Sequence, residues 1–225
     1  FALAVGAVAM AAMGAIGAAL GLERHFDFGK LEAEAAPGQV WRTYGLIGVE
    51  HILMGWDHLL FVIALVLLVR RGWAVAGAVT AFTVAHSLTL AGVTLGLVGL
   101  PPRPVEAVIA LSIVFLAVEL VRGRDRPSLT LRFPWAIAFA FGLFHGFGFA
   151  GALAEIGLPD GEVPAALLAF NLGVEAGQLF VVAVVIAVLA LASRIAARMV
   201  EPAVRVAAYA IGITASYWMI DRIVV

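Results

Sequence analysis

The sequence contains no cysteine and few charged residues, and both absences narrow the classes of function. Without cysteine there is no disulfide framework, no thiolate metal site and no redox motif. Charged residues make up only 13% of the chain and hydrophobic residues 64%, whereas a soluble domain has roughly 25% charged and 45–50% apolar residues. A basic face for nucleic acid is also lacking, because 14 basic residues are offset by 15 acidic ones. A soluble enzyme and a nucleic-acid-binding module are therefore excluded.

Long continuous apolar segments are what the sequence contains instead. They are long enough for helices that cross a hydrocarbon core of ~30 Å, and they lack the ~10-residue alternation of outer-membrane barrel strands. We therefore predict an all-α integral membrane protein, a bundle of about seven transmembrane helices in a lipid bilayer. The expected spans are 1–21, 44–69, 73–99, 104–121, 133–154, 164–192 and 203–224.

Residues 1–42 are expected to stand apart from the transmembrane domain, which would comprise residues 43–225. Segment 1–21 is rich in Ala and Gly and has no ionisable residue. It is longer than the apolar part of a signal peptide, which has about 7–15 residues, so we interpret it as a span and keep a signal peptide as the alternative. Segment 22–42 carries several charges and is interpreted as an extracytoplasmic linker.

Basic residues gather on three of the predicted loops, and this bias orients the bundle. By the positive-inside rule these loops are cytoplasmic, which puts the N-terminus inside and the C-terminus outside a bacterial inner membrane. Trp41, Trp73, Trp135 and Trp218 lie near predicted span ends, as interfacial anchors do, whereas Trp56 does not and could line a site. The basic residues are Arg70, Arg71, Arg122, Arg124, Arg126, Arg132, Arg194, Arg198 and Arg205.

Four histidines and five carboxylates lie inside the predicted spans, where an ionisable group is costly and calls for a partner, a cavity or a function. A helix rises ~1.5 Å per residue, and on that measure the polar side chains form two layers. The midplane layer contains Asp57, His58, His86, Ser112 and His145, with Glu175 and Gln178 close to it. The outer layer contains Glu50, His51, Glu106 and Asn171. Glu119 is expected at the cytoplasmic interface beside Arg122.

The spacing of His51 and His58 predicts two separate stations along one helix. Residues seven apart lie on nearly the same helical face, but their axial separation is about 10 Å. A metal–imidazole bond is only about 2 Å long. The two histidines are therefore not expected to bind one ion together unless the helix breaks at Gly55.

Imidazole and carboxylate without thiolate form a ligand set that suits divalent Ni, Co, Zn, Mn or Fe. We interpret Asp57, His58, His86 and His145 as a functional site. Glu175 is either a ligand or a partner that orients a histidine. Glu50 and Glu106 lie near enough to the interface to be solvated. Hydroxyls such as Thr80 and Thr83, and the small residues Gly142 and Gly146, are expected to serve helix packing.

Several motifs of the chain resemble the HupE/UreJ family of hydrogenase- and urease-associated membrane proteins. The motifs are His51-x5-Asp57-His58, the run from Thr80 to Ala91 around His86, Val105-Glu106 to Ser112, Phe141 to Ala150 around His145, and Phe170-Asn171 to Gln178. The resemblance covers about residues 44–222 and implies a six-helix core that acts as a nickel or cobalt permease. It implies that His51, Asp57 and His58 bind the metal, followed by His86, His145 and Glu175.

The sequence thus predicts a transporter of a divalent metal ion, with Ni²⁺ as the favoured substrate and Co²⁺ or Zn²⁺ as alternatives. Glu50, Glu106, Ser112, Asn171 and Gln178 would form a secondary polar path. Two other hypotheses stay open. One is an intramembrane zinc metalloenzyme, and the other is an accessory subunit of a larger membrane complex. A homo-oligomer is also open, and nucleic acid is not an expected partner.

Overall fold

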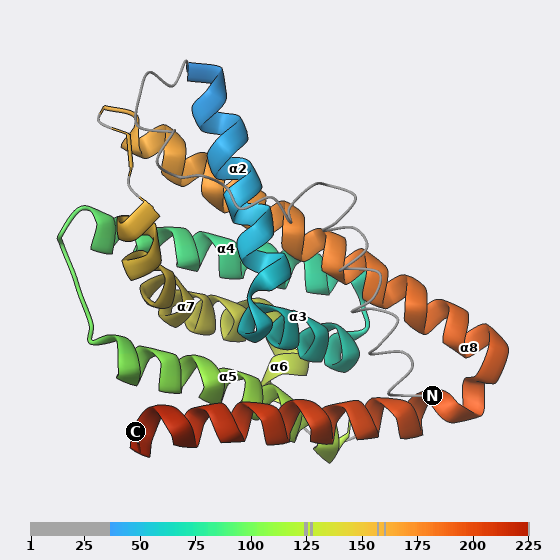
Figure 1. The fold of residues 1–225 in the computed structure, drawn as a ribbon. Helices are drawn as coiled ribbons and strands as arrows, with labels where there is room; N and C mark the ends of the chain where they lie inside the picture. The colour runs from blue at the N-terminus through green and yellow to red at the C-terminus, as the bar shows by residue number, and fades with distance from the viewer. Residues whose placement is uncertain (1–36, 124–125, 127, 157, 160, 225) are drawn as a thin grey trace.

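The computed structural model describes residues 37–123, 126, 128–156, 158–159 and 161–224. In this part of the chain the regular structure is helical, without strands, which confirms the all-α class. The helices are α2 (Pro37–Met54), α3 (Trp56–Val69), α4 (Gly72–Thr94), α5 (Pro102–Arg122), α6 (Leu129–Arg132), α7 (Pro134–Ile156) and α8 (Val163–Val224), arranged as a bundle (Figure 1). The predicted span 1–21 and most of the predicted linker lie outside the described residues, while positions 37–42 of that linker belong to α2.

Several helices are long and apolar enough to cross a membrane, so the chain is a multi-pass membrane protein. Among the described residues four single helices qualify, and α2 and α3 would make a fifth span if they act as a pair. Helix α8 merges two helices across a kink, where Ala196 has the non-helical angles φ −147° and ψ 58°. Figure 1 shows the chain turning back there, and the second arm packs along α5. These arms correspond to the predicted spans 164–192 and 203–224.

The predicted span 44–69 is not one continuous helix, because the helix breaks at Gly55. Helices α2 and α3 meet there at an angle of 71°. Gly55 has extended angles, φ −77° and ψ 95°, and a Cβ at this position would lie 2.6 Å from the carbonyl oxygen of His51. The bend therefore places the chain where only glycine fits without displacement.

Another predicted span ends early. The segment 73–99 stops being helical at Thr94, because Gly96 adopts the left-handed angle φ 69° and its N–H bonds to the carbonyl of Val93. Glycine adopts this conformation without steric cost, so it ends the helix. The short helix α6 was not predicted, and Ser128 caps it by accepting a hydrogen bond from the N–H of Leu131 at 3.1 Å.

The expected close packing at Gly142 and Gly146 is confirmed. Helix α7 packs extensively on α4. A Cβ on Gly142 would lie 2.5 Å from the carbonyl oxygen of Phe82, and one on Gly146 would lie 2.5 Å from that of His86. The missing side chains let the two helices approach closely. This contact brings His145 of α7 to the same level as His86 of α4.

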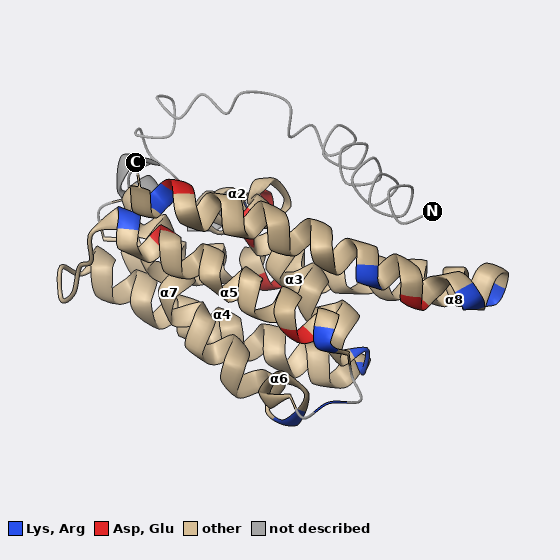
Figure 2. Ribbon diagram, turned by 90° about the horizontal axis from the view of Figure 1, so that it is seen from below, with Lys and Arg blue, Asp and Glu red and all other residues tan. Residues whose placement is uncertain are grey.

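Polar and apolar side chains are distributed as in a membrane protein. The buried polar side chains are His58, His86, Ser112, His145, Asn171 and Gln178, together with three threonines and Glu119, while many large apolar side chains are exposed. Basic positions gather at the end of the bundle that holds α6 and the turn of α8 (Figure 2). The expected grouping of basic loops is therefore present, and which end faces the cytoplasm stays a prediction.

Candidate metal centre

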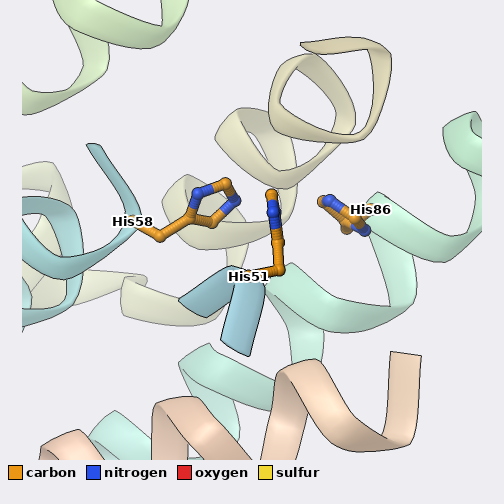
Figure 3. A group of neighbouring side chains, drawn as sticks. All are labelled: His51, His58 and His86. Carbon is orange, nitrogen blue, oxygen red and sulfur yellow. The ribbon is translucent and has the colours of Figure 1, made fainter. Parts of the chain in front are cut away.

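Three histidines from three helices meet inside the bundle. His51 comes from the last turn of α2, His58 from the first turn of α3 and His86 from the middle of α4. Each offers one nitrogen, and these three atoms lie within 4.8 Å of one another. Figure 3 shows the ring of His51 between those of His58 and His86. We call His51, His58 and His86 the triad.

The expectation that His51 and His58 form separate stations is wrong. Their ring centroids lie only 4.6 Å apart, whereas a continuous helix would separate the two residues by about 10 Å. The bend at Gly55 accounts for the difference, because it turns α2 so that its last turn faces the first turn of α3. The two predicted layers therefore merge at this point.

Two of the triad nitrogens have no hydrogen-bond partner. The Nε2 atoms of His51 and His86 are buried, and no partner for them is found among the described residues. A buried polar atom without a partner costs free energy, so such atoms are uncommon unless they bind something. A metal ion at the triad would satisfy both nitrogens.

Asp57 lies behind His58 and fixes its ring. The Asp57 Oδ1 atom accepts a hydrogen bond from the backbone N–H of His58 at 2.8 Å and lies 2.9 Å from its Nδ1. Because an ionised carboxylate can only accept, Nδ1 carries the proton and Nε2 keeps its lone pair. Metal-binding histidines usually have such a partner on the other nitrogen. The structure therefore places Asp57 as an orienting partner of His58, outside the triad itself.

Asn171 has the same relationship to His86. Its Nδ2 donates to the carbonyl of Leu167 at 2.8 Å, so its Oδ1 faces Nδ1 of His86 at 3.1 Å. Nδ1 of His86 then carries the proton, and the unpartnered Nε2 keeps the lone pair. Asn171 was expected in the outer layer, and the structure instead brings it to the centre.

His145 adds a fourth imidazole beside the triad. Ser112 donates its hydroxyl proton to the carbonyl of Ile109 at 2.6 Å and lies 3.2 Å from Nε2 of His145. The hydroxyl oxygen can accept from that nitrogen, which leaves the lone pair on Nδ1. This Nδ1 lies 3.4 Å from Nε2 of His58. Two nitrogens bound to one tetrahedral ion at about 2.0–2.1 Å would be separated by about 3.3–3.4 Å.

Aromatic rings enclose the four imidazoles. The ring centroid of Phe149 lies 3.9 Å from that of His51, and Phe82 lies 4.9 Å from His145. Phe170 packs on both His51 and His86. The sequence did not single out these residues, because phenylalanine in an apolar span has no distinguishing signal. They provide a water-poor wall around the centre.

Glu175 and Gln178 form hydrogen bonds with threonines of α4 and are not part of the triad. Thr80 donates to Glu175 at 2.6 Å, and Thr83 donates to Gln178 at 3.1 Å. The threonines thus join α4 to α8, as expected for helix packing. The Nε2 atom of Gln178 is buried without a partner in the described part of the chain.

The side chains of Glu106 and Glu119 are not simply solvated at the membrane interface, in contrast to the prediction from the sequence. Glu106 accepts from Nε of Arg222 at 3.0 Å. Both residues line a small cavity of about 20 Å³ together with Asp57 and Trp218. Glu119 is buried, with 8% exposure, although it was expected at the interface beside Arg122, and its Oε2 has no partner among the described residues. Glu50 is half-buried on α2.

Comparison with known proteins identifies a family for this fold and centre. The family model described as HupE / UreJ protein matches residues 29–222, which include all of the site residues named above. No curated protein and no solved structure was found to match the chain.

Proposed function

Because the chain belongs to the HupE/UreJ family, we propose that it carries a divalent transition-metal ion across a bacterial inner membrane, with Ni²⁺ as the preferred cargo and Co²⁺ as a second one. The N-terminus would lie inside and the C-terminus outside. The protein is then a transporter that binds its substrate transiently.

The observation that carries this proposal is the convergence of imidazole nitrogens on one buried point. Three nitrogens lie within 4.8 Å of one another, and Nδ1 of His145 lies 3.4 Å from Nε2 of His58. Imidazole without thiolate suits Ni²⁺ and Co²⁺ and is a poor set for Cu⁺. His51, His58, His86 and His145 are thus the proposed ligands, and Asp57 and Asn171 orient two of them.

Polar groups on both sides of the centre provide a route for the ion. On the side of the predicted outer loops, Glu106 and Asp57 share a cavity. On the other side, Thr83 and Gln178, followed by Thr80 and Glu175, form successive polar pairs along α4 and α8. Thr80 precedes His86 by six residues, or about 9 Å of helix. A transported ion must bind well enough to enter and weakly enough to leave, which a series of moderate sites provides.

Uptake of Ni²⁺ into liposomes that contain the purified protein tests this function. The variants His51→Ala, His58→Ala and His86→Ala should each abolish uptake while the protein still inserts. His25→Ala is the matched control, because this histidine belongs to the predicted linker. Uptake that survives in all three triad variants would contradict the proposal.

A second function is favoured by one feature of the centre. The triad alone, with the fourth position open to water and not taken by His145, would match the three-histidine ligand set of catalytic zinc sites. An intramembrane zinc enzyme would retain its metal, whereas a transporter must release it. Elemental analysis after long dialysis separates the two functions: one tightly held zinc per chain favours the enzyme, and exchangeable nickel favours transport.

A further inference from the structure

A second site lies at the basic end of the bundle, away from the histidines. A pocket of about 560 Å³ opens between the end of α3, the start of α4, helix α6 and the start of α7. Its lining includes Arg71, Trp73, Arg132 and Trp135. We call this the Arg–Trp pocket.

The charge of the Arg–Trp pocket is positive and uncompensated. The two arginines line it, and none of its described lining residues is acidic. Neither arginine forms an ion pair with a described carboxylate, whereas Arg70 and Arg222 pair with Glu201 and Glu106. An arginine guanidinium binds phosphate through paired hydrogen bonds. The pocket therefore offers two guanidinium groups to an anionic ligand.

The position of the pocket is that of a lipid headgroup. The pocket lies at the ends of α3, α4 and α7. Helix α4 and part of α7 are candidate membrane spans, and α3 belongs to the bent pair that could form another span. Trp73 and Trp135 are 80% and 59% exposed, and tryptophan at a span end marks the level of the headgroups. Val69 and Leu131 give the pocket an apolar part. A ligand with a phosphate beside an acyl chain would match both the arginines and the apolar residues.

We propose that the Arg–Trp pocket binds the headgroup of an anionic glycerophospholipid. The phosphate lies between Arg71 and Arg132, and the first part of the acyl chains runs past Trp73 and Trp135. Basic pockets between membrane helices are known to hold such headgroups. The bound lipid would fasten the α3–α4 turn to α6, and its binding does not depend on metal transport.

Native mass spectrometry of the purified protein tests the proposal. The delipidated protein is mixed with equal amounts of phosphatidylglycerol and phosphatidylcholine, and the bound lipids are counted. Wild type should retain phosphatidylglycerol preferentially, and the double variant Arg71→Gln/Arg132→Gln should reduce this preference about tenfold or more. Arg194→Gln/Arg198→Gln is the matched control, because it removes two exposed arginines from the same end of the bundle.

The outcomes that would overturn the proposal are specific. An equal loss of preference in both double variants would show an unspecific effect of surface charge. Displacement of the lipid by inorganic phosphate alone would show a site for free phosphate instead of a headgroup.

A second measurement keeps the proposal testable if the arginine variant does not fold. Phosphatidylglycerol with brominated chains should quench tryptophan fluorescence in wild type, and Trp73→Phe/Trp135→Phe should remove most of that quenching. Trp41→Phe/Trp218→Phe should keep it. Quenching that is unchanged in Trp73→Phe/Trp135→Phe would exclude the pocket.

Discussion

His51 and His58 face each other across the bend between α2 and α3, with their ring centroids 4.6 Å apart and their planes at 66°. The two residues belong to one sequence motif but to different helices. The motif therefore brings two imidazoles to one centre, because the break at Gly55 lies between them.

The bend at Gly55 should be necessary for metal binding. In Gly55→Ala the new Cβ would meet the carbonyl oxygen of His51, 2.6 Å away, and alanine also favours a continuous helix. We expect the affinity for Ni²⁺ to fall at least about tenfold, which corresponds to about 1.4 kcal/mol. Equilibrium dialysis with the purified protein measures this. Gly151→Ala is the control, since a Cβ there meets nothing within 4 Å, and equal affinities in both variants would contradict the role of the bend.

Asp57 should act through His58. Asp57→Asn keeps the shape of the side chain but removes the charge that holds the proton on Nδ1 of His58. Loss of a partner of this kind typically lowers metal affinity about 10–100-fold, and we expect that range in isothermal titration with Ni²⁺. Asp221→Asn, which makes the same change at an exposed carboxylate, should leave the affinity unchanged. Full affinity in Asp57→Asn would exclude the orienting role.

Asn171 should be required for the orientation of His86. Asn171→Leu removes the acceptor of the His86 Nδ1 proton, and we expect Ni²⁺ affinity to fall about tenfold. Gln178→Leu removes a buried amide from the same arm of α8, but the hydrogen bond of this amide is made with Thr83. If both variants lose the same affinity in equilibrium dialysis, the effect comes from helix packing and the proposed role of Asn171 is wrong.

Arg222 should compete with the incoming ion for Glu106. Its guanidinium pairs with Glu106 beside the cavity that also contains Asp57. Two unit charges about 4 Å apart interact with an energy of about 1 kcal/mol in water. Removing the positive charge of Arg222 in Arg222→Gln should therefore lower the half-saturating Ni²⁺ concentration of liposome uptake roughly fivefold. Arg42→Gln, at an exposed arginine of α2, should change it little. An unchanged or higher half-saturating concentration in Arg222→Gln would contradict this competition.

The sequence allowed much of the fold to be predicted, because a long apolar run needs a helix to satisfy its backbone in lipid. Helices α4, α5 and α7 and both arms of α8 follow from such runs. The break at Gly55 could not be predicted in the same way, since a single glycine costs a helix only about 1 kcal/mol. Packing between α2, α3 and their neighbours decides whether the helix bends there.

The candidate site was predictable by residue type and less so by contact. His58, His86 and His145 stood out as ionisable groups in apolar segments. Which histidines meet depends on the bend at Gly55, which brings His51 of α2 to His58 of α3, and the sequence alone does not decide whether the helix bends there. The pairing of Glu106 with Arg222 is a further example, because the two residues are 116 positions apart.

We propose that His51, His58 and His86 hold the transported ion together. X-ray absorption at the nickel edge, measured on the purified wild-type protein loaded with Ni²⁺, tests it most directly. We expect at least three imidazole nitrogens in the first coordination shell at about 2.0–2.1 Å, and fewer in each of His51→Ala, His58→Ala and His86→Ala. A nickel shell made of oxygen atoms alone, or one that is identical in wild type and the three variants, would contradict it.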